Sequence, residues 1–378
     1  RLELRRGDSE VSNFPRTADE ITPEWLTQAL RESGAIKRAR VVSIEASPLG
    51  EDSGVTAALH LLTVGYDHIE DNAPEKIVAK HPAADFGPDA PKIRIQNYSR
   101  EASFYRDLAP KLDLKTPAVF FSDFIADTGH FLILVEDLSH LRSVDGSDDC
   151  NYEDAVAVFG DLARLNADWW GSPRLHEYPW LSGMYTFGTP DQLSRNFSNT
   201  LDKFVELRGE YLPAGIEELG RRLAPKFHEL RVNRTNKPTT LTHGDFRTAN
   251  MFFDDSENGS THPVVFDWQQ PQAAKCGIDM AHFLGSSFSV ESRRAIESDL
   301  ISEYYTALID GGVRDYTRSE LEHDIREAAL TRFPLRMVGL AMGGEQMLKT
   351  EQGRLNMIAM CDRLQMLIDW NCEEVIPK

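Results

Sequence analysis

Two different periodicities of apolar residues divide this chain near residue 140. Before that point, short runs rich in valine, isoleucine and leucine are separated by Gly, Asp and Pro, which is typical of β-strands. Beyond residue 149, apolar residues recur at helical spacing almost to the end. A run of strands followed by a run of helices favours an α+β protein. Because 378 residues exceed the usual size of one hydrophobic core, we expect two lobes.

The boundary is predicted at residue 138, which gives a strand-rich lobe of residues 1–138 and a mainly helical lobe of residues 139–378. The first lobe begins with a helix that has Thr22 as N-cap, Pro23 at its first position and Gly34 as its C-terminal stop. One further helix and five strands follow, with the helix predicted at residues 93–112 and the strands at residues 41–50, 54–67, 75–82, 118–127 and 129–138.

A single β-hairpin interrupts the helical lobe. Residues 241–269, LTHGDFRTANMFFDDSENGSTHPVVFDWQ, have the pattern of a loop, a strand, a turn and a strand, with polar residues at both ends of the hairpin. Two lobes would leave a cleft between them, and clefts are where ligand sites are commonly found. We therefore expect the functional site at the polar ends of this hairpin.

The composition narrows the classes of function that this chain could have. The chain has 41 Lys and Arg against 60 Asp and Glu, a net charge of −19, which disfavours nucleic-acid binding. No stretch of about 18 apolar residues is present, so no membrane span is predicted and a cytoplasmic location is the default. The four cysteines lie far apart without metal-ligand spacing, which favours free buried thiols. The oligomeric state stays open.

Three polar residues of the hairpin segment have the chemistry that phosphoryl transfer needs. Asp245 could act as a base, and Asn250 five residues later could hold a metal ion. Asp267 follows Asp245 by 22 positions (267 − 245), at the end of an apolar run. A hairpin of this length can return its far end to its start, and magnesium prefers such oxygen ligands. The alternative, in which these residues only form a turn, needs no chemistry.

The pattern H243-G-D245-F-R-T-A-N250 followed by V-F-D267-W resembles the catalytic loop and metal-binding motif of the aminoglycoside phosphotransferase/choline kinase superfamily. G277-I-D279-M-A-H-F-L, just after it, is similar to the ecdysteroid kinase-like members. The resemblance covers nearly the whole chain. It implies a bilobal protein-kinase-like α+β fold, with a small antiparallel-sheet N-lobe and a larger helical C-lobe carrying a catalytic loop at 243–250 and a metal motif at 267–269. It also implies ATP and Mg²⁺ as cofactors.

The same resemblance predicts nucleotide-binding residues in the first lobe. A lysine on the third strand should pair with a glutamate on the next helix, and Lys80 and Glu101 match these places. Lys76 lies on the same face of the strand and is the competing lysine. Glu101 could instead be a solvated helix carboxylate.

Two further nucleotide contacts rest on position alone. Gly50 and Gly54 would form the phosphate loop, although SPLGEDSGVTAAL departs from the G-x-G-x-x-G pattern and is equally compatible with a plain turn. Glu136 and Leu138 in ILVEDL would contribute backbone groups to the adenine edge at the hinge, where the alternative is an ordinary strand end.

Within the catalytic loop, His243 is expected to brace the loop rather than transfer protons. Asp279 is its expected hydrogen-bond partner by family analogy. Arg247 could contact phosphate or the acceptor, or pair with a surface carboxylate.

These residues together predict an ATP-dependent phosphotransferase acting on a hydroxyl group of a small molecule. The alternatives are a catalytically inactive kinase-like protein that binds a ligand or partner, and an aminoglycoside- or choline-type cation kinase. An apolar or uncharged alcohol is the preferred acceptor, because aromatic and methionine-rich helices would suit it. GTP could replace ATP. A protein kinase is disfavoured, because no A-P-E segment follows the metal motif.

Overall fold

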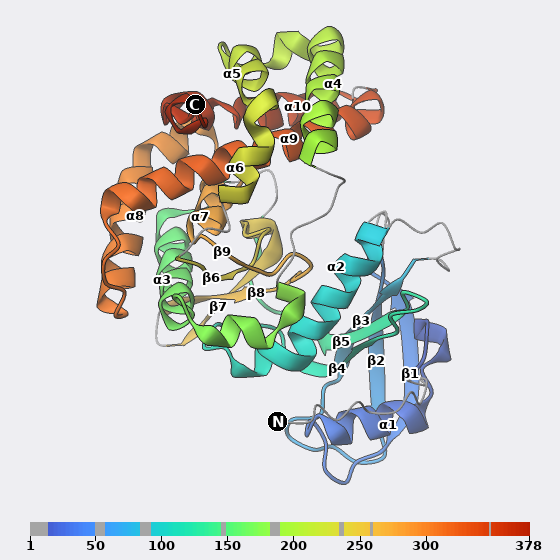
Figure 1. Ribbon diagram of the computed structural model, residues 1–378. Coiled ribbons are helices and arrows are strands. Elements are labelled where there is room, and N and C mark those ends of the chain that lie inside the picture. Colours follow the sequence, from blue (N-terminus) through green and yellow to red (C-terminus); the bar gives the residue numbers. More distant parts are fainter. Residues whose placement is uncertain are drawn as a thin grey trace. The chain divides into compact units, whose positions relative to one another are not determined.

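The computed structural model describes residues 14–49, 57–83, 92–144, 149–181, 190–233, 238–257, 260–347 and 349–378. Contacts divide the chain into two units, the first made of Arg1–Leu112 with Thr116–His140 and the second of Asp113–Lys115 with Leu141–Lys378. The predicted α+β class is confirmed, with a sheet in the first unit and mainly helices in the second (Figure 1).

The first unit is built on a five-stranded antiparallel sheet with the order β1-β2-β3-β5-β4. Its strands are β1 (Val41–Pro48), β2 (Ala57–Tyr66), β3 (Lys76–Pro82), β4 (Val119–Phe124) and β5 (Phe131–Glu136). Its helices are α1 (Pro23–Glu32) and α2 (Lys92–Ser103), and α2 continues through a π-helical turn (Phe104–Leu108) and a 3-10 turn (Ala109–Lys111). The long second helix therefore changes its hydrogen-bonding pattern after Ser103 instead of staying α-helical to residue 112.

The signals at the ends of α1 act as predicted. Thr22 accepts a hydrogen bond from the Trp25 backbone N–H at 3.2 Å, and Pro23 is the first helical residue. Gly34 follows the helix with a φ of 81°, a conformation that glycine adopts without steric cost.

Strand β5 is buried on both faces, because helices cover both sides of the sheet. Leu132 and Leu134 belong to the core cluster that also includes α1 residues. Phe131, which points to the opposite face, stacks on Tyr98 of α2 with ring centroids 4.3 Å apart. The continuous apolar run FLIL follows from this arrangement, and α2 packs against β4 and β5.

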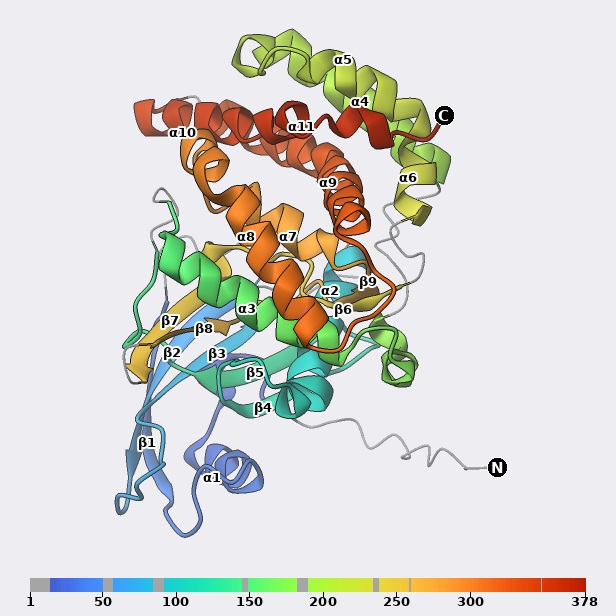
Figure 2. The same cartoon turned by 90° about the vertical axis from the view of Figure 1, so that its left-hand side faces the viewer.

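The second unit carries the helices and two short sheets. Its helices are α3 (Tyr152–Asp168), α4 (Pro190–Arg208), α5 (Ile216–Leu223), α6 (Phe227–Asn233), α7 (Gly277–Leu284), α8 (Val290–Asp310), α9 (Arg318–Met347), α10 (Glu351–Asp362) and α11 (Gln365–Asp369). The predicted hairpin is formed by β7 (Met251–Glu257) and β8 (Ser260–Val265), which lies beside α3 (Figure 2).

A second two-stranded sheet was not predicted. It pairs β6 (Thr240–Thr242) with β9 (Gln272–Ala274) in antiparallel register, with Thr242 opposite Gln272. Strands of three residues are too short to show a period in the sequence. This pairing brings the chain before the hairpin next to the chain after it, so both ends of the segment 243–271 are fixed at one place.

The four cysteines are free and buried, as predicted. Among the helices in the described part of the chain, none is both long and apolar enough to cross a membrane.

Candidate active site

The segment 243–250, which we call the 243–250 loop, leaves β6 and enters β7 through a 3-10 turn, Thr248–Asn250. It turns sharply at Gly244, where φ is 84°. A Cβ at this position would lie 2.3 Å from the backbone oxygen of Gln270. Only glycine fits both the left-handed backbone and the close approach of the two chain segments. Steric constraints therefore explain why glycine occupies the middle position of the H-G-D motif.

Asp279, in the first turn of α7, holds the start of the loop. Its carboxylate accepts hydrogen bonds from the backbone N–H groups of His243 (2.7 Å) and Gly244 (2.8 Å). The side chain is fully buried, and this burial raises its pKa, while His243 and the two N–H donors act in the opposite direction. Asp279 thus contacts the backbone of His243 rather than its ring.

The His243 ring joins two other backbone segments. Its Nδ1 accepts from the Asp245 N–H at 3.1 Å, so its Nε2 carries the hydrogen and donates to the Phe266 carbonyl at 2.9 Å. The ring is buried and packs against Trp268, with centroids 4.5 Å apart. Both nitrogens are used by the backbone, so the geometry gives His243 a bracing position and no open proton-transfer position.

Asp245 and Asn250 are directly bonded. Asn250 Nδ2 donates to the Asp245 carbonyl at 2.8 Å and to its Oδ2 at 3.1 Å. Because both donor bonds come from Nδ2, the amide oxygen of Asn250 is left for another interaction. Asn250 is buried, whereas the Asp245 side chain is 19% exposed. The Asp245 carboxylate is therefore fixed by Asn250 and remains partly accessible to solvent.

Asp267 lies just beyond β8 with a φ of 61°, an uncommon conformation for a residue with a side chain. Phe266 N–H donates to the Asn250 carbonyl at 3.0 Å, so the two predicted metal ligands belong to one hydrogen-bonded crossing of the chain. Gln269 Nε2 donates to Asp267 Oδ1 at 2.7 Å. Strained backbone of this kind is common at functional sites.

Metal ligation by this segment would rest on one amide oxygen and one carboxylate. The described residues include no group of three or more His, Cys, Asp or Glu side chains that could hold a metal ion. A pair of oxygen donors, Asn250 and Asp267, fits magnesium, which is usually held by one or two protein oxygens together with phosphate and water.

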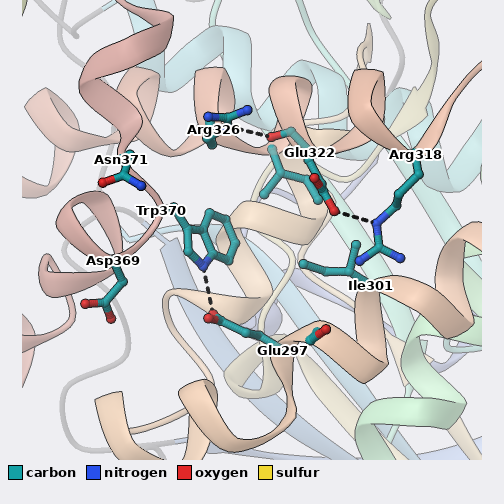
Figure 3. A pocket seen from close by; sticks show the side chains of 10 residues that line it. Glu297, Ile301, Arg318, Glu322, Arg326, Asp369, Trp370 and Asn371 are labelled. Carbon is teal, nitrogen blue, oxygen red and sulfur yellow. Dashed lines mark hydrogen bonds and ion pairs between the residues drawn. The ribbon is translucent and has the colours of Figure 1, made fainter.

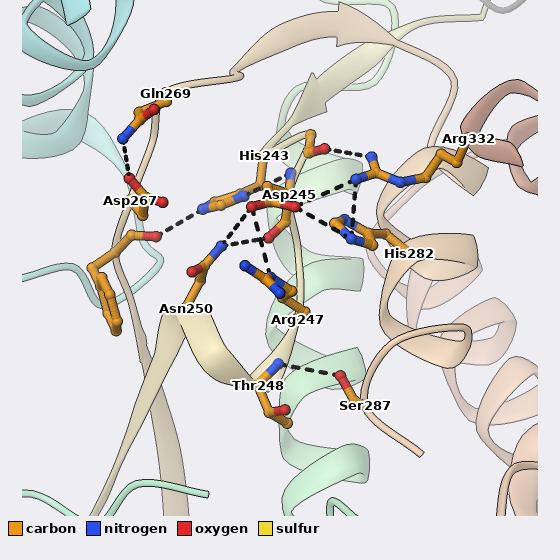
Figure 4. Close-up of polar contacts among 12 residues, drawn as sticks. His243, Asp245, Arg247, Thr248, Asn250, Asp267, Gln269, His282, Ser287 and Arg332 are labelled. Carbon is orange, nitrogen blue, oxygen red and sulfur yellow. Dashed lines mark hydrogen bonds and ion pairs between the residues drawn. The ribbon is translucent and has the colours of Figure 1, made fainter. Parts of the chain in front are cut away.

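Two residues that the sequence interpretation missed also contact Asp245. His282 Nε2, from α7, lies 3.2 Å from Asp245 Oδ1, and Arg332 Nη2, from α9, lies 3.4 Å from the same oxygen (Figure 4). Arg332 Nη1 also donates to the Gly244 carbonyl at 2.6 Å. His282 lies inside the quoted G-I-D-M-A-H-F-L segment, one turn after Asp279, and helical spacing could have indicated it. Arg332 is 87 positions from Asp245, and no local pattern marks it.

Arg247 lies on the other side of the same carboxylate. Its Nε is 3.7 Å from Asp245 Oδ2, and its side chain is 44% exposed. The carboxylate that Arg247 approaches is Asp245 itself, and a contact of Arg247 with phosphate or acceptor stays a prediction.

The predicted lysine–glutamate pair is present within the first unit. Lys80 Nζ lies 2.8 Å from Glu101 Oε1, and the Glu101 side chain is only 2% exposed. Glu101 is therefore not a solvated helix carboxylate. Lys76 is exposed, so Lys80 is the strand lysine that meets the glutamate. The pair joins β3 to α2.

The remaining predicted nucleotide contacts are less defined. Gly50 and Gly54 lie outside the described residues. Glu136 ends β5, and its N–H donates to the Ala118 carbonyl at 2.9 Å, so an adenine contact at this residue would use its carbonyl. Leu138 is buried.

A pocket of about 330 Å³ lies in the second unit between α8, α9 and the segment after α11, and no residue of the 243–250 loop lines it (Figure 3). Its charged groups are already engaged, either with one another or with charged residues just outside the lining. Trp370 Nε1 donates to Glu297 at 2.9 Å, and Arg318 pairs with Glu322 at 2.8 Å. This pocket therefore offers little polar capacity for a ligand, in contrast to the 243–250 loop.

The fold is that of the protein-kinase-like small-molecule kinases. The GDP complex of wild-type aminoglycoside 2'-phosphotransferase-IIIa matches with a TM-score of 0.53 and 13% identity, covering 86% of this chain and 94% of that one. The GDP and kanamycin complex of APH(2")-IIIa matches with a TM-score of 0.52 and 13% identity, covering 93% and 99%. An ethanolamine kinase of Plasmodium vivax gives a TM-score of 0.48 at 13% identity, covering 87% and 83%.

At these identities the structural likeness establishes the fold alone, and it confirms the predicted bilobal kinase-like architecture. The family follows from the sequence. Residues 57–314 match the ecdysteroid kinase-like family, and the chain belongs to this family. No curated protein matches the chain.

Proposed function

We propose that the protein is an ATP-dependent phosphotransferase that phosphorylates a hydroxyl group of a small molecule, with Asp245 as the catalytic base. The observation that carries this proposal is the arrangement of Asp245 and Asn250. A partly accessible carboxylate is fixed by a buried amide whose oxygen stays available, next to a second carboxylate, Asp267, on the crossing chain. This is the donor set that phosphoryl transfer requires.

In the proposed reaction, the O–H bond of the acceptor breaks and its proton passes to the Asp245 carboxylate. The acceptor oxygen bonds to the γ-phosphorus, while the bond from that phosphorus to the β–γ bridging oxygen breaks and its electron pair leaves with ADP. Asp245 would orient the hydroxyl throughout, because this transition state needs positioning more than a strong base.

Asn250 and Asp267 would hold Mg²⁺, which when bound neutralises charge on the phosphate oxygens. Lys80 would contact the α- and β-phosphates, and Glu101 would hold its ammonium group in place. The buried position of Glu101 supports this role, because a fixed carboxylate keeps the lysine in one orientation. The solved aminoglycoside phosphotransferase complexes contain GDP, so a guanine nucleotide is the alternative phosphate donor to test.

We infer that the acceptor is an uncharged alcohol rather than a polycation. Arg332 and Arg247 approach the two oxygens of Asp245 at 3.4 and 3.7 Å. Two guanidinium groups next to the base repel a cationic acceptor and offset the attraction expected from the net charge of −19.

The direct test is calorimetric titration of a non-hydrolysable ATP analogue, with and without Mg²⁺, and of the GTP analogue in parallel. Wild type is compared with Asp267→Asn and with Asp254→Asn, which removes a carboxylate of the neighbouring strand β7 that pairs with Lys115. Magnesium-dependent binding that is lost only in Asp267→Asn supports the proposal.

Turnover is then measured as ADP release from Mg-ATP with water, ethanolamine, kanamycin, a phenol and a sterol as acceptors. The absence of nucleotide binding under all conditions would overturn the proposal. Binding without turnover above that of Asp245→Asn would instead identify a kinase-like protein that binds nucleotide without catalysis.

A further inference from the structure

The two oxygens of the Asp245 carboxylate have different surroundings. Oδ1 faces two nitrogen atoms from separate helices, His282 Nε2 at 3.2 Å and Arg332 Nη2 at 3.4 Å. Oδ2 accepts one hydrogen bond, from Asn250 at 3.1 Å, and lies at the longer distance of 3.7 Å from Arg247. Figure 4 shows His282 and Arg332 on one side of Asp245 and Asn250 and Arg247 on the other.

A carboxylate oxygen has two lone pairs, and each can accept one hydrogen bond. Arg332 Nη2 donates to Oδ1 and His282 Nε2 lies beside the same oxygen, so two nitrogen atoms surround Oδ1 whichever of them donates. The hydrogen bond from Asn250 accounts for only one lone pair of Oδ2 among the described residues. An acceptor hydroxyl can therefore bond to Oδ2 without displacing an existing contact.

We propose that His282 and Arg332 are positioning residues that occupy Oδ1 of Asp245 and so assign Oδ2 as the oxygen that takes the acceptor's proton. This inference rests on the proposed phosphotransferase function. Both residues would act through Asp245 and not on the substrate. They act by fixing the rotation of the Asp245 carboxylate and by leaving one oxygen available on the side of Arg247.

Arg332 is suited to this task because its guanidinium group is planar and donates in several directions. It reaches the Gly244 carbonyl with Nη1 at 2.6 Å, and with Nη2 it reaches both Asp245 and His282 Nε2, the latter at 3.0 Å. It therefore ties the base to the backbone of the residue before it. A lysine would keep the charge but would not make these contacts together.

His282 can support the carboxylate in either protonation state of Nε2. Arginine only donates, so an unprotonated Nε2 accepts from Arg332, and Arg332 carries the contact to Oδ1. A protonated Nε2 donates to Oδ1 directly. The imidazole is 7% exposed, so water does not compete strongly for this contact.

The variants that test the proposal are Arg332→Lys, His282→Leu and the conservative His282→Gln, whose amide nitrogen lies near the position of Nε2. The matched controls are Arg326→Lys and His323→Gln, which lie on α9 in ion pairs away from the loop. ADP release from Mg-ATP is measured with the best acceptor of the panel above, water included, and analogue binding and thermal unfolding are measured in parallel.

We expect kcat to fall by roughly 10-fold to 100-fold in Arg332→Lys and His282→Leu, since small displacements of a catalytic group have effects of this order. The dissociation constant of the ATP analogue should stay within about twofold of wild type, His282→Gln should recover most of the lost rate, and the controls should match wild type.

Two failures can be told apart. If wild type turns over faster than Asp245→Asn but folded Arg332→Lys and His282→Leu match wild type, the positioning role is overturned and the proposed function stands. A uniform loss of nucleotide affinity or an equal defect in His282→Gln also overturns it, because either result indicates general structural damage. If wild type is no faster than Asp245→Asn, both proposals fall.

Discussion

Two of the ionic clusters of this protein, the Lys80–Glu101 pair and the surroundings of Asp245, are built in opposite ways. Lys80 and Glu101 come from regular elements, β3 and the last turn of α2, and meet at 2.8 Å. Asp245 lies on a loop, and its carboxylate is approached from the same loop, from α7 and from α9. Both hold a charged group in one orientation.

This difference shows which parts of the structure must fix the orientation of each charged group. Strand and helix backbones are already rigid, so the elements that carry Lys80 and Glu101 fix much of the geometry of this pair. A loop has no ladder of its own hydrogen bonds, so the base needs support from several directions. We therefore expect substitutions around Asp245 to have larger and more specific consequences than substitutions around Lys80.

The largest expected effect is that of Asp245→Asn. An amide cannot take the proton of the acceptor, and general-base contributions are typically about 10²–10⁴-fold. Turnover measured as ADP release should fall by this factor while affinity for the ATP analogue is retained. Asp254→Asn is the control on the adjacent strand. A decrease of less than about tenfold in Asp245→Asn would contradict the assignment of the base.

Gly244→Ala tests the loop's dependence on the chain crossing. The left-handed backbone costs a residue with a side chain about 1–2 kcal/mol. The contact of the new Cβ with the Gln270 oxygen adds an overpacking cost of about 1–3 kcal/mol. We expect a loss of about 2–5 kcal/mol in the free energy of unfolding, measured by denaturant titration.

Gly34→Ala is a matched control for this substitution. Gly34 has nearly the same φ, 81° against 84°, but its Cβ would meet nothing within 4 Å. It should lose only the backbone part, about 1–2 kcal/mol. Equal losses in the two variants would show that the crossing of the chain at Gln270 adds no constraint.

The same contrast explains what the sequence could and could not predict. Strand and helix periodicity gave the α+β order, and the resemblance to the kinase superfamily predicted the contact of Lys80 with Glu101. Asp245 and Asn250 were found together because their contact is local, five residues apart. The β6–β9 sheet was missed because three-residue strands have no period.

Arg332 was missed for a different reason. Its contact with Asp245 spans 87 positions and depends on how α9 packs against α7, which no local pattern encodes. His282 is an intermediate case. Its segment was identified from the sequence, but the face of the helix that points toward Asp245 was not. Long-range packing against a loop is the part of the site that a single sequence does not reveal.

Lys80→Met tests the Lys80–Glu101 pair, the other ionic cluster of the comparison. A hydrogen bond to a charged group contributes about 1.5–3 kcal/mol, so affinity for the ATP analogue should fall roughly 10-fold to 100-fold. Lys76→Met, on the same strand and exposed, should bind as wild type. The measurement is calorimetric titration with Mg²⁺. If Lys76→Met shows the larger loss, the pairing with Glu101 does not mark the nucleotide-binding lysine.

The smallest effect on stability is expected for Arg247→Ala. Its ion pair with Asp245 is loose, at 3.7 Å, and its side chain is 44% exposed, and exposed pairs of this kind contribute about 0–1 kcal/mol. The denaturant midpoint should be nearly that of wild type, whereas Arg332→Gln should be clearly destabilised because Arg332 is 17% exposed and bonds the Gly244 carbonyl.

The two arginines approach the Asp245 carboxylate from opposite sides. Comparing their variants therefore distinguishes a residue that supports the base from one that contacts the acceptor or phosphate. A stable Arg247→Ala with lowered turnover would place Arg247 on the reacting side, at Oδ2. Equal destabilisation by both substitutions would mean that the two sides of Asp245 are structurally alike.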